Sequence, residues 1–287
     1  MAHRRISWLR IFSFILLAVC LATSACQLRP PPPIPGAETL FEGITYTREV
    51  RTTPRLMVVH LVQIDLRAQG LSLFVTPGDP TRDLPVDART TSQFLTEFGV
   101  QLAINGDGFT PWSSNLLSAY PQPGDPVDPL GLAISNGIPY SQPRDSVPTL
   151  YITPNGKVTL NDPPRNIAFA LSGLQMLVQN GNILPELDTD PAPRTALGLN
   201  RASKILTLLL VDGRQPGYSE GATLNELATL LLENGVHNGM NLDGGGSTTL
   251  VIEGENGPVI LNSPIDGNFP GQERPVANHL GIFARPR

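Results

Sequence analysis

The chain has 287 residues, of which 40% are apolar and 16% are charged, and its formal net charge is −5. A chain of this length can bury a sizeable core, in one large domain or two small ones. Because no long basic run occurs beyond the N-terminus, nucleic acid finds no electrostatic attraction here, and we expect no nucleic-acid partner. The 29 prolines and 27 glycines are spread along the chain and predict many turns and short strands.

Residues 1–26 are typical of an export signal. A basic N-terminal region precedes the apolar stretch 11–21, which is short for a membrane span. Small residues then precede Cys26, as in the lipobox of a bacterial lipoprotein, in which the cysteine is lipidated. We expect an exported protein on the extracytoplasmic side of the membrane, which it would contact only through a lipid on Cys26. Ordinary secretion, with cleavage after Ala25, is the alternative.

Residues 27–37 contain a run of prolines and predict a stiff, extended tether. The folded domain is expected over residues 38–287. The only cysteines, Cys20 and Cys26, both precede it, so the domain has neither a disulfide nor a cysteine-based metal site.

The pattern of apolar residues predicts short strands and two helices, at 91–98 and 223–233. Thr223 and Glu226 form a capping box at the start of the second helix. Residues 169–177 could be strand or helix, and the polar, proline-rich stretch 111–129 is predicted as a long loop. The strands are expected, in chain order, at 56–65, 71–76, 100–104, 132–134, 149–152, 157–160, 196–199, 205–211, 240–243, 250–253 and 280–283. This order predicts an α+β fold, a strand-rich single domain of mixed sheet with a few helices.

Three of the predicted strands end in polar loops that contain glycine. These loops begin at Asn105, Asp212 and Asp243, and the first also carries Asp107. Rigid strands position side chains well, so strand ends are common places for a site. Each loop, taken alone, could equally be a structural turn.

The most distinctive segment is 241–248, Asn-Leu-Asp-Gly-Gly-Gly-Ser-Thr. Three glycines remove every Cβ from the loop, so that a ligand can approach the backbone, and their N–H groups could form a nest for an anion. Asp243 precedes the glycines, and Ser247 and Thr248 follow them. A glycine-rich turn with no ligand is the alternative interpretation.

Six ordered motifs in this chain resemble the phosphodiester glycosidase family (NAGPA-type domain) over roughly residues 40–285. The strongest is Asn-Leu-Asp-Gly-Gly-Gly-Ser-Thr-Thr at 241–249. The others are Ala-Ile-Asn-Gly at 103–106 with Phe109, Arg-Thr-Ala-Leu-Gly at 194–198, Val-Asp-Gly-Arg at 211–214, Gly-Ala-Thr-Leu-Asn-Glu-Leu-Ala at 221–228 and Glu-Arg-Pro-Val-Ala-Asn at 273–278. Asp107 departs from the family, which more often has glycine there.

The resemblance implies hydrolysis of a sugar 1-phosphodiester, with a phosphorylated glycan as substrate. Arginine matches two phosphate oxygens at once, and a carboxylate below the sugar ring stabilises the positive charge that develops there. The catalytic candidates are Asp243, Asp212 and Asn105. The phosphate-binding candidates are Arg194, Arg274, Gly244, Gly245, Gly246 and Ser247, and further candidates are Asp107, Glu273, Asn278 and Thr248.

Two alternatives remain open at this point. The oxygen ligands Asn105, Asp107, Asp212 and Asp243 would suit Ca²⁺ or Mg²⁺, although the sequence requires no cofactor and has no EF-hand or HExxH spacing. The domain could also be a non-catalytic lipoprotein module that binds phosphate-bearing glycans of the cell envelope. Such a module would keep the arginines but would not need Asp243.

Overall fold

The computed structural model describes residues 37–113 and 119–286, which belong to one compact unit. The export signal, Cys26 and residues 27–36 of the predicted tether lie outside these residues, so the boundary between signal and tether stays a prediction. The first strand, β1, begins at Ala37.

The largest sheet of the described residues has eight strands in the order β1-β2-β3-β17-β16-β18-β14-β15, and we call it the large sheet. Its strands are β1 Ala37–Phe41, β2 Ile44–Arg51, β3 Met57–Asp65, β14 Gln175–Gln179, β15 Asn182–Ile183, β16 Arg194–Asn200, β17 Ile205–Val211 and β18 Val236–Asn241. Asp212 and Asp243 therefore follow two strands, β17 and β18, that both pair with β16.

Three smaller sheets complete the described strands. One has the order β10-β9-β13-β11-β12, one β20-β19-β6-β21-β4 and one β5-β8-β7. Their strands are β4 Ser72–Val75, β5 Val86–Asp87, β6 Leu102–Asn105, β7 Phe109–Thr110, β8 Pro126–Pro129, β9 Ala133–Ser135, β10 Ile138–Ser141, β11 Thr149–Ile152, β12 Val158–Leu160, β13 Phe169–Ser172, β19 Leu250–Gly254, β20 Gly257–Ile260 and β21 His279–Phe283.

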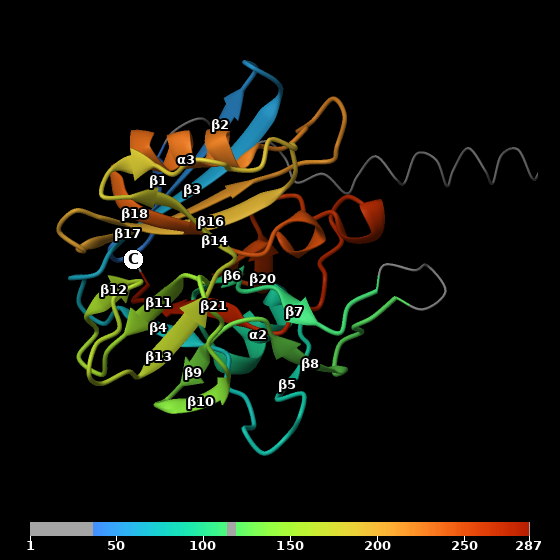
Figure 1. The fold of residues 1–287 in the computed structure, drawn as a ribbon. Coiled ribbons are helices and arrows are strands. Elements are labelled where there is room, and N and C mark those ends of the chain that lie inside the picture. Colours follow the sequence, from blue (N-terminus) through green and yellow to red (C-terminus); the bar gives the residue numbers. More distant parts are fainter. Residues whose placement is uncertain (1–36, 114–118, 287) are drawn as a thin grey trace, which may run out of the picture. The chain divides into compact units, whose positions relative to one another are not determined.

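The large sheet is buried on both faces, which explains the unbroken apolar run of β17. Leu206, Leu208 and Leu210 point into the core shared with the two five-stranded sheets, whereas Leu209 and Val211 point to the opposite face. Helix α3 (Leu224–Glu233) covers that opposite face, as Figure 1 shows. Successive side chains of a strand alternate between faces, so one strand serves both cores.

Helix α2 (Thr91–Phe98) packs Phe94 and Leu95 against the sheet that contains β6. Helix α2 begins where the sequence predicts, α3 begins one residue later with Thr223 as its N-cap, and the predicted capping box of α3 is present. The Thr223 hydroxyl accepts from the Glu226 N–H (3.1 Å), and the Glu226 carboxylate accepts from the Thr223 N–H (2.8 Å). Each cap satisfies a backbone donor that has no partner inside the helix.

The strand-rich α+β prediction is confirmed, with three corrections in detail. The strands that pair directly are antiparallel, where mixed sheets were predicted; β17 and β18, joined through α3, run parallel to each other but are separated by β16. Residues 169–177 form two strands, β13 and the start of β14. The predicted loop 111–129 contains a strand, β8, which pairs with β5 and β7.

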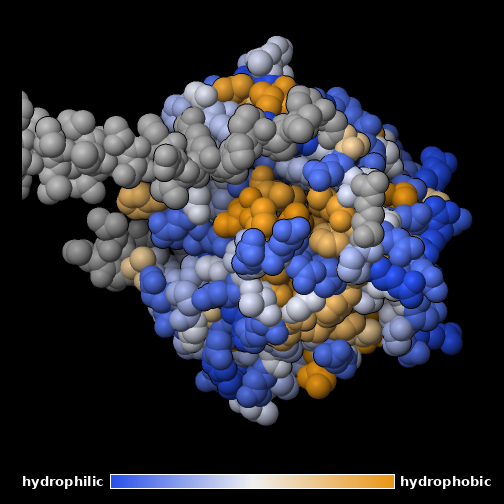
Figure 2. Space-filling view, turned by 180° about the vertical axis from the view of Figure 1, so that it is seen from behind, coloured by the Kyte–Doolittle hydropathy of each residue, from blue (hydrophilic) through white to orange (hydrophobic). Residues whose placement is uncertain are grey.

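Figure 2 shows one face of the molecule, where an apolar area is bordered by hydrophilic residues. Within 37–113 and 119–286, no helix has both the length and the apolar character to traverse a bilayer.

Candidate active site

A cavity of about 250 Å³ lies where the segment after β6, the glycine loop and the segment before β21 meet. Asp243 and Arg274 are its charged lining residues, and the apolar lining includes Trp112 from the stretch predicted as a loop. The complete lining is Gly108, Phe109, Trp112, Leu130, Leu174, Asp243 and Arg274. One carboxylate and one guanidinium thus share a largely apolar cavity, an arrangement typical of a binding site.

The backbone of Asp243 is fixed from both sides. The Asn105 Nδ2 donates to the Asp243 carbonyl (2.7 Å), and the Asp243 N–H donates to the Gly106 carbonyl (3.0 Å). Burial raises the pKa of Asp243, and hydrogen bonding from Ser247 and the charge of Arg274 act against the rise. A raised pKa in a cavity is a property shared by many catalytic carboxyl groups.

Asn105 is buried beneath Asp243 and supports it. Its Oδ1 accepts from the Thr195 hydroxyl (2.8 Å) and from the Thr249 N–H (3.2 Å). The amide therefore joins β6, β16 and the end of the glycine loop. This geometry makes Asn105 a positioning residue, whereas the sequence analysis named it as a catalytic candidate.

The glycine loop contains a short 3₁₀ turn, Gly245–Ser247, and differs from the predicted anion nest. The Gly244 N–H donates to the Asp243 Oδ1 (2.9 Å), and the Gly245 N–H donates to the Pro193 carbonyl (2.8 Å). Two of the three glycine N–H groups thus have partners within the protein, so they are not available to a phosphate.

The glycines instead let other groups come close. A Cβ on Gly244 would lie 2.7 Å from the Pro193 carbonyl oxygen, and one on Gly245 would lie 3.0 Å from Arg214 Nη1. A Cβ on Gly246 would collide with the guanidinium of Arg274. Gly245 also has a φ of +62°, which favours glycine. The absence of Cβ atoms therefore lets two arginines lie against the loop.

Arg274 is held over the loop by three contacts. Its Nε donates to Asp266 Oδ1 (2.6 Å), its Nη1 lies 3.4 Å from the Ser247 hydroxyl, and its Cζ lies 5.1 Å from the centre of the Trp112 ring. Asp266 lies in the short 3₁₀ turn Asp266–Asn268. The predicted grouping of Asp243, Ser247 and Arg274 is thus present in the structure.

Arg214 is a site residue that the sequence analysis quoted within a motif but did not select. It is exposed, and no carboxylate of the described residues forms an ion pair with it. Partial burial, followed by repulsion from Arg274 and Arg194, lowers its pKa. A guanidinium beside a second one is a favourable place for an anion. Its position in Val-Asp-Gly-Arg, directly after a strand end, was the available signal.

Arg194 does not line the cavity. Its Nη2 donates to Asp188 Oδ2 (2.9 Å) and to the Asp190 carbonyl (2.7 Å), and its Nε donates to the Ala222 carbonyl (3.1 Å). These bonds hold the segment before β16 against the start of α3. The structure gives no geometric support to the predicted contact between Arg194 and phosphate.

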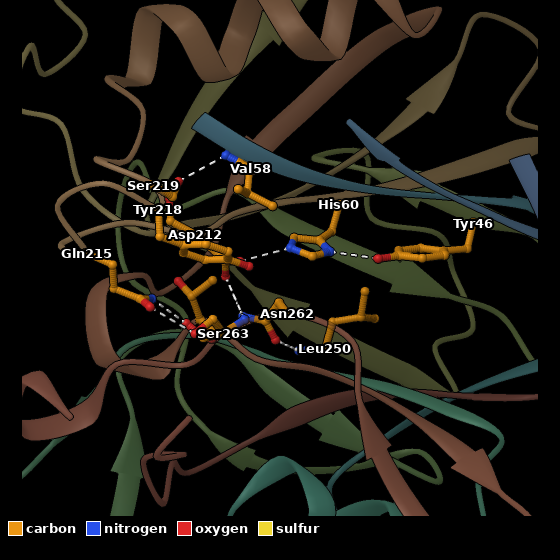
Figure 3. Close-up of polar contacts among 11 residues, drawn as sticks. Tyr46, Val58, His60, Asp212, Gln215, Tyr218, Ser219, Leu250, Asn262 and Ser263 are labelled. Atoms are coloured by element: carbon orange, nitrogen blue, oxygen red, sulfur yellow. Dashed lines mark hydrogen bonds and ion pairs between the residues drawn. The ribbon is translucent and has the colours of Figure 1, made fainter. Parts of the chain in front are cut away.

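Asp212 is fully buried and does not line the cavity. Figure 3 shows the side chains that surround it. Its Oδ2 accepts from His60 Nε2 and from the Tyr218 hydroxyl, both at 3.0 Å. Its Oδ1 accepts from the Ser263 N–H (2.9 Å) and from Asn262 Nδ2 (3.1 Å). Burial alone would raise the pKa of Asp212, but His60 and these donors outweigh it and lower that pKa.

His60 continues this network towards β2. Its Nδ1 is 2.8 Å from the Tyr46 hydroxyl, so the imidazole joins Tyr46 to Asp212. Ionised Asp212 accepts from Nε2, which leaves Nδ1 to accept from the tyrosine. With four donors on its two oxygens, Asp212 has no room for a substrate or a metal ion, and its predicted catalytic role has no geometric support.

Asp107 and Asn278 are both buried, bond to each other and do not line the cavity. The Asp107 N–H donates to Asn278 Oδ1 (2.8 Å), and Asp107 Oδ2 accepts from the Gly131 N–H (2.7 Å). Burial raises the pKa of Asp107 to about 7, and the negative charge of Asp243 adds to the rise. Asp107 Oδ1 and Asn278 Nδ2 are buried without a partner among the described residues.

Glu273 and Thr248 form hydrogen bonds to other segments of the protein. Glu273 Oε2 accepts from the Ser92 N–H (2.9 Å) in the first turn of α2, and burial raises its pKa. The Thr248 carbonyl accepts from Asn262 Nδ2 (3.0 Å), and the Thr248 side chain is buried. Neither residue lines the cavity of Asp243.

The metal alternative was assigned to Asn105, Asp107, Asp212 and Asp243. Across 37–113 and 119–286, no three acidic, histidine or cysteine side chains lie close enough together to hold an ion. Asp212 and Asn105 have protein partners at their oxygens.

Comparison with protein families places residues 73–283 in a match to the phosphodiester glycosidase (NAGPA) family. N-acetylglucosamine-1-phosphodiester alpha-N-acetylglucosaminidase of Mus musculus is 26% identical over 244 residues, which are 78% of this chain and 45% of the mouse protein. The protein of the same name from Bos taurus is 48% identical over 61 residues, 21% of this chain and 11% of the bovine protein. The chain spans less than half the length of these curated relatives.

Solved structures show the same fold. The catalytic domain of the zebrafish enzyme of that name, auto-inhibited by its pro-peptide, matches with a TM-score of 0.58 and 20% identity, over 90% of this chain and 86% of that one. A hypothetical protein from Synechocystis matches with a TM-score of 0.55 and 17% identity, over 90% of this chain and 65% of that one. The strand-rich architecture is thus shared with an enzyme domain.

Proposed function

Because the chain belongs to the phosphodiester glycosidase family, we propose that it hydrolyses the glycosidic bond of a sugar 1-phosphodiester in the cavity between Asp243 and Arg274. The mouse and bovine relatives are named for N-acetylglucosamine 1-phosphodiesters, which makes this sugar the first substrate to test. A phosphorylated glycan of the cell envelope or the extracellular space is the proposed source.

One observation carries the proposal: a carboxyl group with a raised pKa shares a cavity with one guanidinium and lies close to a second. Arg274 lines the cavity with Asp243, and the charges of Arg214 and Asp243 interact. The phosphodiester has one negative charge, for which the two arginines supply donors. The sugar then lies on the apolar wall, with its anomeric carbon towards Asp243.

In the proposed reaction, the bond between the anomeric carbon and the phosphate oxygen breaks, and the electron pair leaves with that oxygen. Water supplies the hydroxyl of the released sugar, and the second product is a phosphomonoester. Asp243 stabilises the positive charge that develops on the ring. Arg274 and Arg214 stabilise the extra negative charge on the departing phosphate. Asn105 and the N–H of Gly244 hold Asp243 in place.

The experiment that tests the proposal follows hydrolysis of N-acetylglucosamine 1-(methyl phosphate) in ¹⁸O-labelled water. Cleavage at the anomeric carbon places ¹⁸O in the sugar and releases methyl phosphate. Label in the phosphate instead would assign the protein to the phosphodiesterases, which break the P–O bond. Binding without turnover would support the non-catalytic glycan-binding module.

Asp243→Ala is the matched test variant, and it should lose turnover. Asp83→Ala is the control, because Asp83 is an exposed aspartate outside the cavity. Equal turnover by both variants would remove Asp243 from the mechanism.

The proposed location is the extracytoplasmic side of a membrane, with a lipid on Cys26 as anchor. Its support is the basic and apolar sequence before that cysteine. Radiolabelled palmitate should enter the full-length chain in a bacterial host and be lost in Cys26→Ser. Release of both chains to the medium, unlabelled, would favour ordinary secretion.

A further inference from the structure

Asp107 is a buried carboxyl group next to the cavity of Asp243, although it does not line that cavity. It is 1% exposed. Gly108, the next residue, lines the cavity, and the carbonyl of the preceding Gly106 accepts from the Asp243 N–H (3.0 Å). The segment 106–108 therefore runs beside the glycine loop, close enough that the charge of Asp243 acts on Asp107.

The two oxygens of Asp107 have few partners for a buried charge. Oδ2 accepts from the Gly131 N–H (2.7 Å), whereas Oδ1 is buried without a hydrogen-bond partner among the described residues. Within 37–113 and 119–286, none of the ion pairs includes Asp107. A buried carboxylate without a counter-ion is costly, and a carboxyl group in such a place avoids the cost by keeping its proton.

The titratable groups near Asp107 give it little compensation. The charge of Asp243 opposes its ionisation, and Arg144, which favours ionisation, is exposed to solvent that screens its charge. Burial, followed by the charge of Asp107, raises the pKa of Tyr140, so this hydroxyl stays neutral. Burial also lowers the pKa of His279 to about 3, so this imidazole is neutral as well.

Asp243 is better placed to carry the negative charge of the pair. Its carboxylate accepts from the Gly244 N–H (2.9 Å), and the charges of Arg274 and Arg214 favour its ionisation. Arg274 is also paired with Asp266, so the two arginines have little positive charge to spare for a second carboxylate. Two interacting carboxyl groups lose their protons in separate steps, and these contacts assign the first loss to Asp243.

We propose that Asp107 is a positioning residue that holds a proton beside Asp243, so that the pair carries a single negative charge and the cavity keeps its affinity for an anion. Loss of this proton adds a negative charge without a counter-ion and weakens anion binding at Arg274 and Arg214. The kinetic consequence rests on the proposed function, whereas the binding of an anion needs no turnover. The cavity therefore binds an anionic ligand best on the acidic side of neutrality.

Binding is tested first with dimethyl phosphate, a phosphodiester that stays singly charged throughout the pH range of the experiment. The chain has two tryptophans, so in full-length Trp8→Phe protein the fluorescence of Trp112, beside Arg274, reports on the cavity. The affinity should be about tenfold higher at about pH 5.5 than at about pH 8.5. Absence of saturable binding at every pH would overturn the inference.

Asp107→Asn in the same background tests which group causes the decline. The amide keeps an acceptor for the Gly131 N–H but cannot ionise, so the ratio of the two affinities should fall to about two or less. Asp107→Gly, with the residue that the family more often has, should flatten the profile as well and serves if the first variant does not fold. Asp83→Asn, at an exposed aspartate, is the control and should keep the wild-type ratio.

Asp243→Asn tests the coupling between the two carboxyl groups. Without the negative charge of Asp243, Asp107 loses its proton more easily, so the midpoint of the decline should move to lower pH. A midpoint that stays where it is in the wild type would show that the two groups do not share their protons.

Kinetics extend the test to N-acetylglucosamine 1-(methyl phosphate). In the wild type, kcat/KM should fall about tenfold between about pH 6 and pH 8.5, and in Asp107→Asn this fall should be about twofold or less. A purely structural role of Asp107 would lower kcat/KM by the same factor at every pH and leave the shape of the profile unchanged.

The two proposals fail in distinguishable ways. Hydrolysis with the same pH profile in the wild type, Asp107→Asn and Asp107→Gly overturns the role of Asp107 and leaves the glycosidase in place. Binding of dimethyl phosphate that declines with pH in the wild type and not in Asp107→Asn, with no hydrolysis by either protein, overturns the glycosidase and supports the role of Asp107.

Discussion

Asp212 and Asp243 have the same local sequence setting but opposite surroundings. Each follows a strand that pairs with β16, and each precedes glycine. Asp212 is fully buried with four hydrogen-bond donors, and its pKa is lowered. Asp243 reaches a cavity, and its pKa is raised.

The difference comes from residues distant in sequence. His60, Tyr218, Asn262 and Ser263 converge on Asp212 and stabilise its charge, although burial by itself would raise its pKa. Around Asp243, burial is only partly offset by Ser247 and Arg274. The Asp212 carboxylate therefore contributes to stability. The Asp243 carboxyl group has a raised pKa in a cavity, which is a property of many catalytic groups.

The largest expected effect is a loss of activity when Asp243, rather than Asp212, is replaced. Asp243→Asn should lower kcat about a thousandfold or more, because the neutral amide cannot stabilise positive charge on the sugar. Its thermal unfolding should stay close to that of the wild type. Initial rates with the methyl diester, together with circular dichroism, check both statements. If Asp243→Asn retained half of the wild-type kcat, Asp243 would have no catalytic role.

The next largest effect is a loss of stability when Asp212 is replaced. Asp212→Asn should lower the free energy of unfolding by about 3 kcal/mol, because an amide group would face donors and leave them buried without partners. Urea denaturation at pH 7 measures the loss. Asp83→Asn, at an exposed aspartate, is the matched control.

The difference in stability between the wild type and Asp212→Asn should depend on pH. The pKa of Asp212 is lower in the folded state than in the unfolded chain, so its stabilising effect is present above the ordinary aspartate pKa. The difference between wild type and Asp212→Asn should therefore shrink as pH falls through the folded pKa. A difference that grows on acidification would contradict this account.

A smaller effect is expected from the two arginines Arg214 and Arg194. Arg214→Ala should lower kcat/KM by about ten- to a hundredfold, the effect of one lost charge-assisted hydrogen bond. Arg194→Ala should act mainly on stability, since its guanidinium bonds to Asp188, Asp190 and Ala222. Steady-state kinetics and urea denaturation of both variants are the measurements. The reverse pattern would restore Arg194 to the phosphate site.

The smallest expected effect concerns Asp107, the buried neighbour of Asp243. Its pKa of about 7 exceeds that of an unfolded aspartate, so the folded chain holds a proton that the unfolded chain has lost. Wild-type stability should then decline between about pH 4 and 7 from this group. Asp107→Asn removes this contribution and should gain about 1–2 kcal/mol relative to wild type between pH 6 and pH 8. Parallel stability curves for the two proteins would show that Asp107 has an ordinary pKa.

Much of the fold could be predicted because its signals are local. The apolar run of β17 and the capping box of α3 depend on residues a few positions apart, and both appear as expected. Strand β8 was missed because its two prolines and its aspartate look like a loop, whereas pairing with β5 and β7 makes it a strand.

The site was less predictable because burial and pairing are decided by distant segments. The motifs identified Asp243 and Arg274, which share the cavity. They also selected Asp212, as the second choice of carboxylate, and Arg194, and only tertiary structure shows the partners that occupy these two. Trp112 has no local motif, so nothing near it in the sequence indicated a cavity wall.

The dipeptide Glu273–Arg274 connects two parts of the molecule. Glu273 bonds to the first turn of α2, and its neighbour Arg274 lies on the glycine loop. Residues 89 and 276 exchange backbone bonds in both directions beside this link. Fraying of α2 would therefore loosen Arg274, the arginine proposed to bind the phosphate. Hydrogen exchange at the Ser92 amide should consequently slow when an anion occupies the cavity, so a helix remote from the chemistry would report on ligand occupancy.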